Sequence, residues 1–124
     1  MLRKILIIIP MIFCLIMGSL AFMSPDIIGS ILGVSADNAA GRGTISGDFG
    51  AFFFTAAGAA ALALFNGKSN LLWVPVSLLG LTFIGRIFEV SSTGIGESTM
   101  QPIIIEVVLL VMLLAALKLS KQDA

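Results

Sequence analysis

Long apolar runs separated by short polar segments form the dominant pattern along this chain. Four runs are uncharged over most of their length, and they cover residues 5–23, 49–65, 71–90 and 102–119. A helix needs about 20 apolar residues to cross the hydrocarbon core of a bilayer, and open strands would leave backbone groups unpaired in lipid. The pattern therefore predicts an all-α integral membrane protein. We expect one domain, residues 1–124, built as an antiparallel bundle of four transmembrane helices.

The polar segments predict how the four runs are connected. Ser-Pro-Asp at 24–26 offers an N-cap, a proline at the first helical position and an early acid. A short helix over 27–32, lying along the membrane interface, is therefore expected after the first span. Residues 33–48 are rich in Gly, Ser, Ala and Asn, which favours a loop, whereas 66–70 favours a tight turn. Residues 91–101 are expected to form a second loop.

The first apolar run has an alternative interpretation as a cleavable signal peptide. Arg3 and Lys4 precede the run, and Ser19-Leu20-Ala21 offers a small-residue cleavage site. However, the run is longer than the apolar core of about 7–15 residues that is usual in signal peptides. The sequence therefore favours a retained helix, with cleavage near residue 21 left open.

Composition excludes several classes of protein. Hydrophobic residues make up 58% of the 124 residues and charged residues only 11%, whereas soluble domains have about 25% charged residues. Lys+Arg 7 balances Asp+Glu 7, so there is no basic surface for a nucleic acid. Histidine, the commonest metal ligand and general base, is absent. The single cysteine allows no intrachain disulfide. We therefore expect neither a metal site nor a cofactor.

The basic residues predict the orientation in the membrane. Lysine and arginine are enriched in cytoplasmic loops of membrane proteins. With four spans, one side of the membrane carries Arg3, Lys4, Lys68, Lys118 and Lys121. The other side carries Arg42 alone outside the spans. We therefore expect both termini in the cytoplasm.

Charged residues near the outer side are the candidate functional residues. Arg86 and Glu89 lie near the outer end of the third span, and Glu106 lies about one turn inside the start of the fourth. Asp48 directly precedes the second span, and Arg42 stands in the loop before it. These positions predict that the charges converge at one depth. Arg86 can touch Glu89, three residues later on its helix, or reach Glu106 across the helix pair.

Two interpretations of this cluster remain open. A charge inside a span costs roughly 2.5–3.5 kcal/mol on insertion scales, so such residues should face the bundle interior and pair with one another. A functional cluster would form an outward-facing polar pocket that binds a small ligand or a lipid headgroup, or that moves a proton. A structural cluster would be an ion-pair network that locks the third and fourth helices together.

Several short motifs resemble those of one known family. They are Gly-Thr-Ile-Ser-Gly-Asp-Phe-Gly at 43–50, Gly85-Arg86 in the third span and Glu106 in the fourth. The chain resembles a bacterial family of small four-pass membrane proteins catalogued as domain of unknown function 4345. The resemblance implies a four-helix membrane bundle in a bacterial inner membrane and no established activity. It places Asp48, Gly50, Arg86 and Glu106 at the family's polar positions. The family often has an acidic residue beside the Gly after the third helix, whereas this chain has Thr93-Gly94.

A more distant similarity to DoxX-like membrane proteins rests on architecture alone. From these observations we expect a non-enzymatic accessory subunit or a bundle that binds a small ligand or lipid. The alternatives are a small proton-coupled transporter, or a membrane enzyme acting on a lipid-like substrate with Glu106 as acid and base. Expected partners are membrane lipid, a small hydrophobic or anionic ligand, and a second copy or another membrane protein.

Overall fold

The computed structural model describes residues 1–94 and 100–122, and the elements formed by these residues are all helical. The four long helices are α1 (Leu2–Met23), α4 (Gly50–Phe65), α5 (Trp73–Thr93) and α6 (Met100–Gln122). The shorter elements are α2 (Pro25–Leu32), α3 (Ala39–Thr44), a π-helical turn (Ile45–Phe49) and a 3₁₀ turn (Ser69–Leu72). Four helical segments are long and apolar enough to cross a membrane: Leu2–Met23, Ala39–Phe65, Ser69–Thr93 and Met100–Ser120. The predicted all-α, multi-pass membrane architecture is therefore confirmed.

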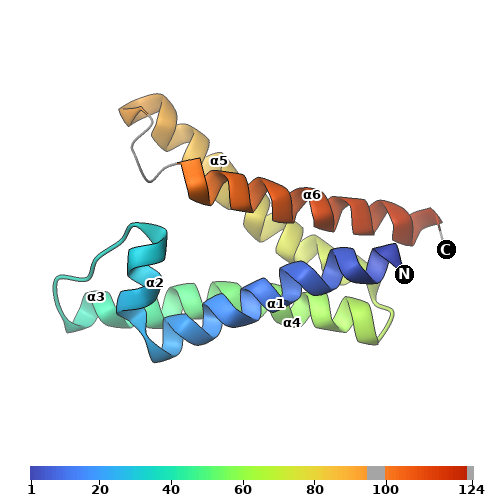
Figure 1. The fold of residues 1–124 in the computed structure, drawn as a ribbon, viewed down its shortest axis with the longest axis horizontal. Coiled ribbons are helices and arrows are strands. Elements are labelled where there is room, and N and C mark those ends of the chain that lie inside the picture. The colour runs from blue at the N-terminus through green and yellow to red at the C-terminus, as the bar shows by residue number, and fades with distance from the viewer. Residues whose placement is uncertain (95–99, 123–124) are drawn as a thin grey trace.

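The long helices form two antiparallel pairs that meet at one end and diverge at the other (Figure 1). Helix α1 packs most extensively against α4, and α5 packs against α6. At the end that holds both termini, all four helices lie close together. At the opposite end, the α5–α6 pair turns away from the α1–α4 pair, and α2 lies near the opening.

The distribution of buried side chains explains this shape. At the terminal end, one core cluster takes residues from all four long helices, with Ile7, Leu72 and Leu113 fully buried. The second cluster consists of buried residues from α1, α2, the π-helical turn and α4: Cys14, Met17, Ala21, Ile28, Ile45, Phe53, Ala56 and Ala57. Alanines on α4 let the backbones of α1 and α4 approach closely, as small residues do in membrane bundles. Because α2 completes the second cluster, α5 and α6 are free to diverge there.

Hydrogen bonds from Arg3 close the terminal end of the bundle. Its Nε donates to the Ser120 hydroxyl near the end of α6, and its Nη2 donates to the Ser69 hydroxyl at 2.9 Å. Ser69 begins the 3₁₀ turn within the connection between α4 and α5. One side chain at the start of α1 therefore ties the end of α6 to the connection between α4 and α5, and the opening lies at the far end.

The prediction of a loop over 33–48 is wrong for its second half. Residues 39–49 are helical and continue directly into α4. The Asn38 side chain accepts a hydrogen bond from the Gly41 backbone N–H at 2.9 Å and so caps α3. Ile45 is buried in the second core cluster. A cap and one apolar anchor are enough to order a segment whose composition is typical of loops.

The remaining predicted boundaries agree with the structure to within a few residues. The short helix expected over 27–32 is α2, which begins two residues earlier at Pro25. It ends at Gly33, whose φ of 75° is the left-handed conformation that favours glycine. The turn expected over 66–70 gives way to 3₁₀ helix at Ser69. Of the loop expected over 91–101, residues 95–99 lie outside the described residues.

Candidate functional site

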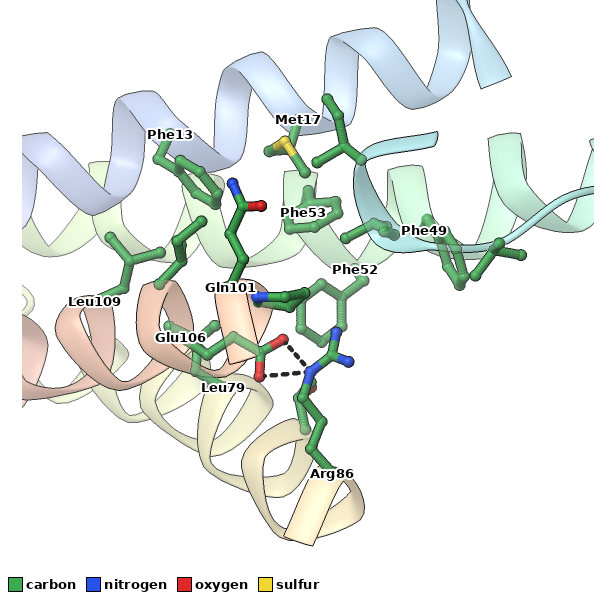
Figure 2. Close-up of a pocket in the computed structure, with 16 residues that line it drawn as sticks. Phe13, Met17, Phe49, Phe52, Phe53, Leu79, Arg86, Gln101, Glu106 and Leu109 are labelled. Atoms are coloured by element: carbon green, nitrogen blue, oxygen red, sulfur yellow. Dashed lines mark hydrogen bonds and ion pairs between the residues drawn. The ribbon is translucent and has the colours of Figure 1, made fainter. Parts of the chain in front are cut away.

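A cavity of about 280 Å³ lies where the two helix pairs diverge (Figure 2). Every long helix contributes to its wall, and α2 covers one side. The lining residues are Phe13, Met17, Ile31, Leu32, Val34, Phe49, Phe52, Phe53, Leu79, Thr82, Arg86, Gln101, Pro102, Ile105, Glu106 and Leu109. The cavity therefore exists because the second core cluster holds α1, α2 and α4 together while α5 and α6 turn away.

Most of the wall is apolar. Four phenylalanines line it, with Phe52 and Phe53 packed edge to face at a centroid distance of 5.1 Å. Leu79 and Leu109 close the inner end from α5 and α6, and both are buried. An apolar wall of this kind with a few convergent polar groups is the usual construction of a small-molecule site.

Arg86 and Glu106 supply the charged part of the wall. The Arg86 Nε donates to both carboxylate oxygens of Glu106, at 2.9 Å each. The side chains are 27% and 13% exposed, so the pair is largely withdrawn from the surface. The pair connects α5, which carries Arg86, to α6, which carries Glu106, at the wall of the cavity (Figure 2). Arg86 therefore reaches across the helix pair, one of the two contacts that spacing allowed.

The structure does not bring the other three predicted charges to this pair. Arg42 forms an exposed ion pair with Asp26 at the start of α2. Glu89 is exposed and accepts a hydrogen bond at 2.8 Å from the Thr93 hydroxyl on its own helix. Asp48 is exposed in the π-helical turn and forms no ion pair with any described residue.

The expected convergence of five charges at one depth is thus reduced to one pair. The reason is local: α2 folds back and offers Arg42 a carboxylate close by, at Asp26. Glu89 lies only one turn from the end of α5, where a carboxylate is exposed and does not need a buried partner. The cavity itself therefore contains a single cation and a single carboxylate among the residues described.

Two uncharged polar residues of the wall, Thr82 and Gln101, are not among the residues predicted from the sequence. Thr82 precedes Arg86 by four residues, so both lie on one face of α5, and its hydroxyl donates to the Leu78 carbonyl at 2.8 Å. The four-residue spacing from Arg86 is the sequence signal that could have identified Thr82 as a residue facing the same way. Gln101 lies at the start of α6, and its amide extends towards Phe13 and Met17 in Figure 2. No pattern in the sequence indicates that Gln101 faces the cavity.

Chemically, the cavity presents hydrogen-bonding groups beside a large apolar wall. Arg86 offers guanidinium donors, and Gln101 offers an amide that both donates and accepts. Within residues 1–94 and 100–122, no group of three or more Cys, Asp or Glu side chains is placed to hold a metal ion. The arrangement is suited to an amphipathic molecule with one polar end.

Comparison of the chain with family models, with curated proteins and with solved structures gave no match. The resemblance to the domain of unknown function 4345 family therefore stays a prediction that rests on the motifs quoted above. The cavity and its charged pair are therefore the structural features that bear on function.

Proposed function

We propose that this protein is a non-enzymatic membrane protein that binds a small amphipathic molecule in the cavity between its helix pairs. The chain of the ligand lies against the phenylalanines, and its polar end meets Arg86 and Glu106. One observation carries the proposal: the ion pair between α5 and α6 forms part of the wall of an otherwise apolar cavity. A charge pair that served only to hold two helices together would have no need to border an empty space.

The volume of the cavity and the energetic cost of placing charges inside spans support the same interpretation. Charged residues inside spans are expensive and commonly mark ligand or ion pathways. At about 280 Å³, the cavity is near the lower limit of sites for drug-sized molecules, which run from about 300 to 1,000 Å³. It therefore suits one alkyl chain with a compact head better than a lipid with two chains.

We also propose that the protein lies in a bacterial inner membrane, as the family resemblance implies. Both termini are then in the cytoplasm, as the Lys and Arg distribution favours. The cavity then lies in the outer half of the bilayer, because it is at the end opposite the termini. A ligand would enter from the outer leaflet through the space between the diverging helix pairs.

Photo-crosslinking tests this proposal directly. The protein is reconstituted in liposomes with a fatty acid or a fatty alcohol that carries a diazirine in its chain, and labelled residues are mapped by mass spectrometry. We expect the label from at least one probe to concentrate on cavity residues such as Phe52 and Leu109. If both probes instead label the cavity residues no more than the lipid-facing side chains, the proposal is contradicted.

Adjacent isoleucines on α6 provide a matched pair of variants. Ile105 lines the cavity, whereas Ile104 is 55% exposed and lies outside the lining. Ile105→Phe should fill the cavity and lower cavity labelling several-fold, while Ile104→Phe should leave the labelling unchanged. Equal labelling in the two variants would show that the probe does not occupy the cavity.

A further inference from the structure

The terminal nitrogens of Arg86 have no partner among the described residues. Its Nε alone makes both bonds to Glu106, and no hydrogen bond or ion pair between residues of the described segments uses Nη1 or Nη2. In Figure 2 these two nitrogens lie on the side of the guanidinium away from Glu106, beside Phe52. Arg86 therefore keeps four N–H donors available at the cavity wall.

The shape of this free edge points to a particular acceptor. The two terminal nitrogens of a guanidinium form a planar fork that matches two oxygens of a carboxylate or phosphate. Beside the fork lies Phe52, whose side chain offers no hydrogen-bond acceptor. The Thr82 hydroxyl donates to the Leu78 carbonyl, and the described hydrogen bonds of Arg86 go to Glu106 and not to this hydroxyl. Among the residues that the structure describes, the fork thus has no acceptor, and it borders the space for a ligand.

We propose that the ligand is a single-chain amphiphile with an anionic oxygen head, a carboxylate or a phosphate ester, held by the terminal nitrogens of Arg86. This inference rests on the proposed function and adds the chemical class of the ligand. The chain occupies the apolar part of the cavity, towards Leu79 and Leu109. The head lies at the mouth, where Arg86 remains 27% exposed.

Glu106 does not cancel this attraction, because it occupies a different edge of the guanidinium. Both of its oxygens accept from Nε, so the guanidinium stands between the carboxylate and an anion bound at the fork. The anion would be in contact with the positive charge and further from the negative one, and Coulomb energy falls with distance. An ammonium head would meet the donors of Arg86 instead of an acceptor.

A head-group series on the wild-type protein tests the inference. Dodecanoic acid, dodecyl phosphate, dodecanol and dodecylamine compete with the diazirine fatty acid for cavity labelling, alongside inorganic phosphate alone. Charge-assisted hydrogen bonds are worth about 1.5–3 kcal/mol, which corresponds to about tenfold or more in affinity. We expect the acid and the phosphate ester to compete at least about tenfold better than the alcohol and the amine. Inorganic phosphate should compete poorly if the head belongs to a lipid, and well if a free anion is the ligand.

Two variants separate the fork from the charge. Arg86→Lys keeps the positive charge and loses the fork, so the preference for the acid over the alcohol should fall several-fold. Glu106→Gln removes the nearby negative charge and keeps an oxygen for Nε, so that preference should rise. Because the readout is a ratio between two heads of equal chain length, a loss of folded protein does not alter it.

The two proposals fail in different ways. If neither diazirine probe labels the cavity, ligand binding itself is wrong. If the probes label the cavity and the alcohol or the amine competes as well as the acid, the site exists and the anionic head is wrong. An acid preference that survives unchanged in Arg86→Lys would also overturn the role given to the terminal nitrogens.

Discussion

Arg86 and Glu106 each depend on the other, because each would be left as an unpaired charge if its partner were removed. Both are largely withdrawn from the surface, at 27% and 13% exposed. We expect Arg86→Ala and Glu106→Ala each to lower the free energy of unfolding in detergent by about 1–3 kcal/mol. The double variant should lose less than the sum of the two, since it leaves no charge uncompensated.

Glu89→Ala is the control for this cycle. Glu89 is exposed near the end of α5 and interacts with Thr93 on its own helix, so its loss should change stability little. Denaturant unfolding of the wild type, the two single variants and the double variant gives the coupling energy between Arg86 and Glu106. Effects of Arg86→Ala and Glu106→Ala that add to within about 0.5 kcal/mol would mean that the pair contributes no mutual stabilisation.

At this scale, the sequence predicts which charges can meet but not which do. The sequence allowed Arg86 to contact either Glu89 or Glu106, and the structure has the contact with Glu106. The ion pair between Arg42 and Asp26 depends on how α2 folds back, and no local sequence pattern predicts that geometry. The position of Gln101 in the cavity wall likewise depends on where α6 begins relative to α1 and α4.

At the scale of elements, helix α2 determines whether the cavity is covered. Gly29 on α2 is buried, and a Cβ at this position would press against the backbone carbonyl oxygen of Val34. The same turn is held by the Val34 N–H, which donates to the Gly29 carbonyl at 2.7 Å. Because a backbone oxygen cannot move aside, Gly29→Ala should displace the end of α2, which carries Ile31 and Leu32 into the cavity wall.

We expect Gly29→Ala to lower the free energy of unfolding by about 1–3 kcal/mol, as overpacking does, and to lower cavity labelling by the diazirine probe. Gly58→Ala is the matched control, because nothing lies within 4 Å of a Cβ there. In the middle of α4, alanine should stabilise the helix by up to about 1 kcal/mol. Equal behaviour of the two variants would argue against a tight turn at the end of α2.

The long elements follow directly from the sequence, whereas the short ones do not. A run of about 20 apolar residues has one stable form in a bilayer, which is why the spans were predictable from hydropathy alone. Residues 39–49 have the composition of a loop, and their helical form depends on Asn38 as a cap and on a tertiary contact of Ile45. Composition carries neither kind of information.

At the scale of the whole molecule, the two ends of the bundle differ in a way that the apolar runs do not reveal. Arg3 ties the terminal end together through Ser69 and Ser120. At the other end, α5 and α6 diverge and the cavity opens. The runs are apolar over most of their length at both ends of the bundle, so hydropathy cannot tell where the helices separate. The placement of α2 and of the charged pair marks the open end.

This asymmetry makes the orientation in the membrane testable, because the closed end carries both termini and the connection at Lys68, and the open end carries Asp37. Both residues are exposed, and the native Cys14 is buried. In a Cys14→Ala background, Asp37→Cys should react with a membrane-impermeant maleimide on intact bacterial cells. Lys68→Cys should react only after the cells are permeabilised, since basic residues favour the cytoplasmic side.

The labelling pattern distinguishes the remaining arrangements. Labelling of Lys68→Cys alone in intact cells would reverse the orientation and place the cavity in the inner leaflet. Labelling of both variants would put the first and second connections on one side and contradict a second span over Ala39–Phe65. Labelling of Asp37→Cys alone places the cavity mouth, with the free edge of Arg86, in the outer half of the bilayer. The amphiphile would then come from the outer leaflet, without crossing the closed end that Arg3 ties together.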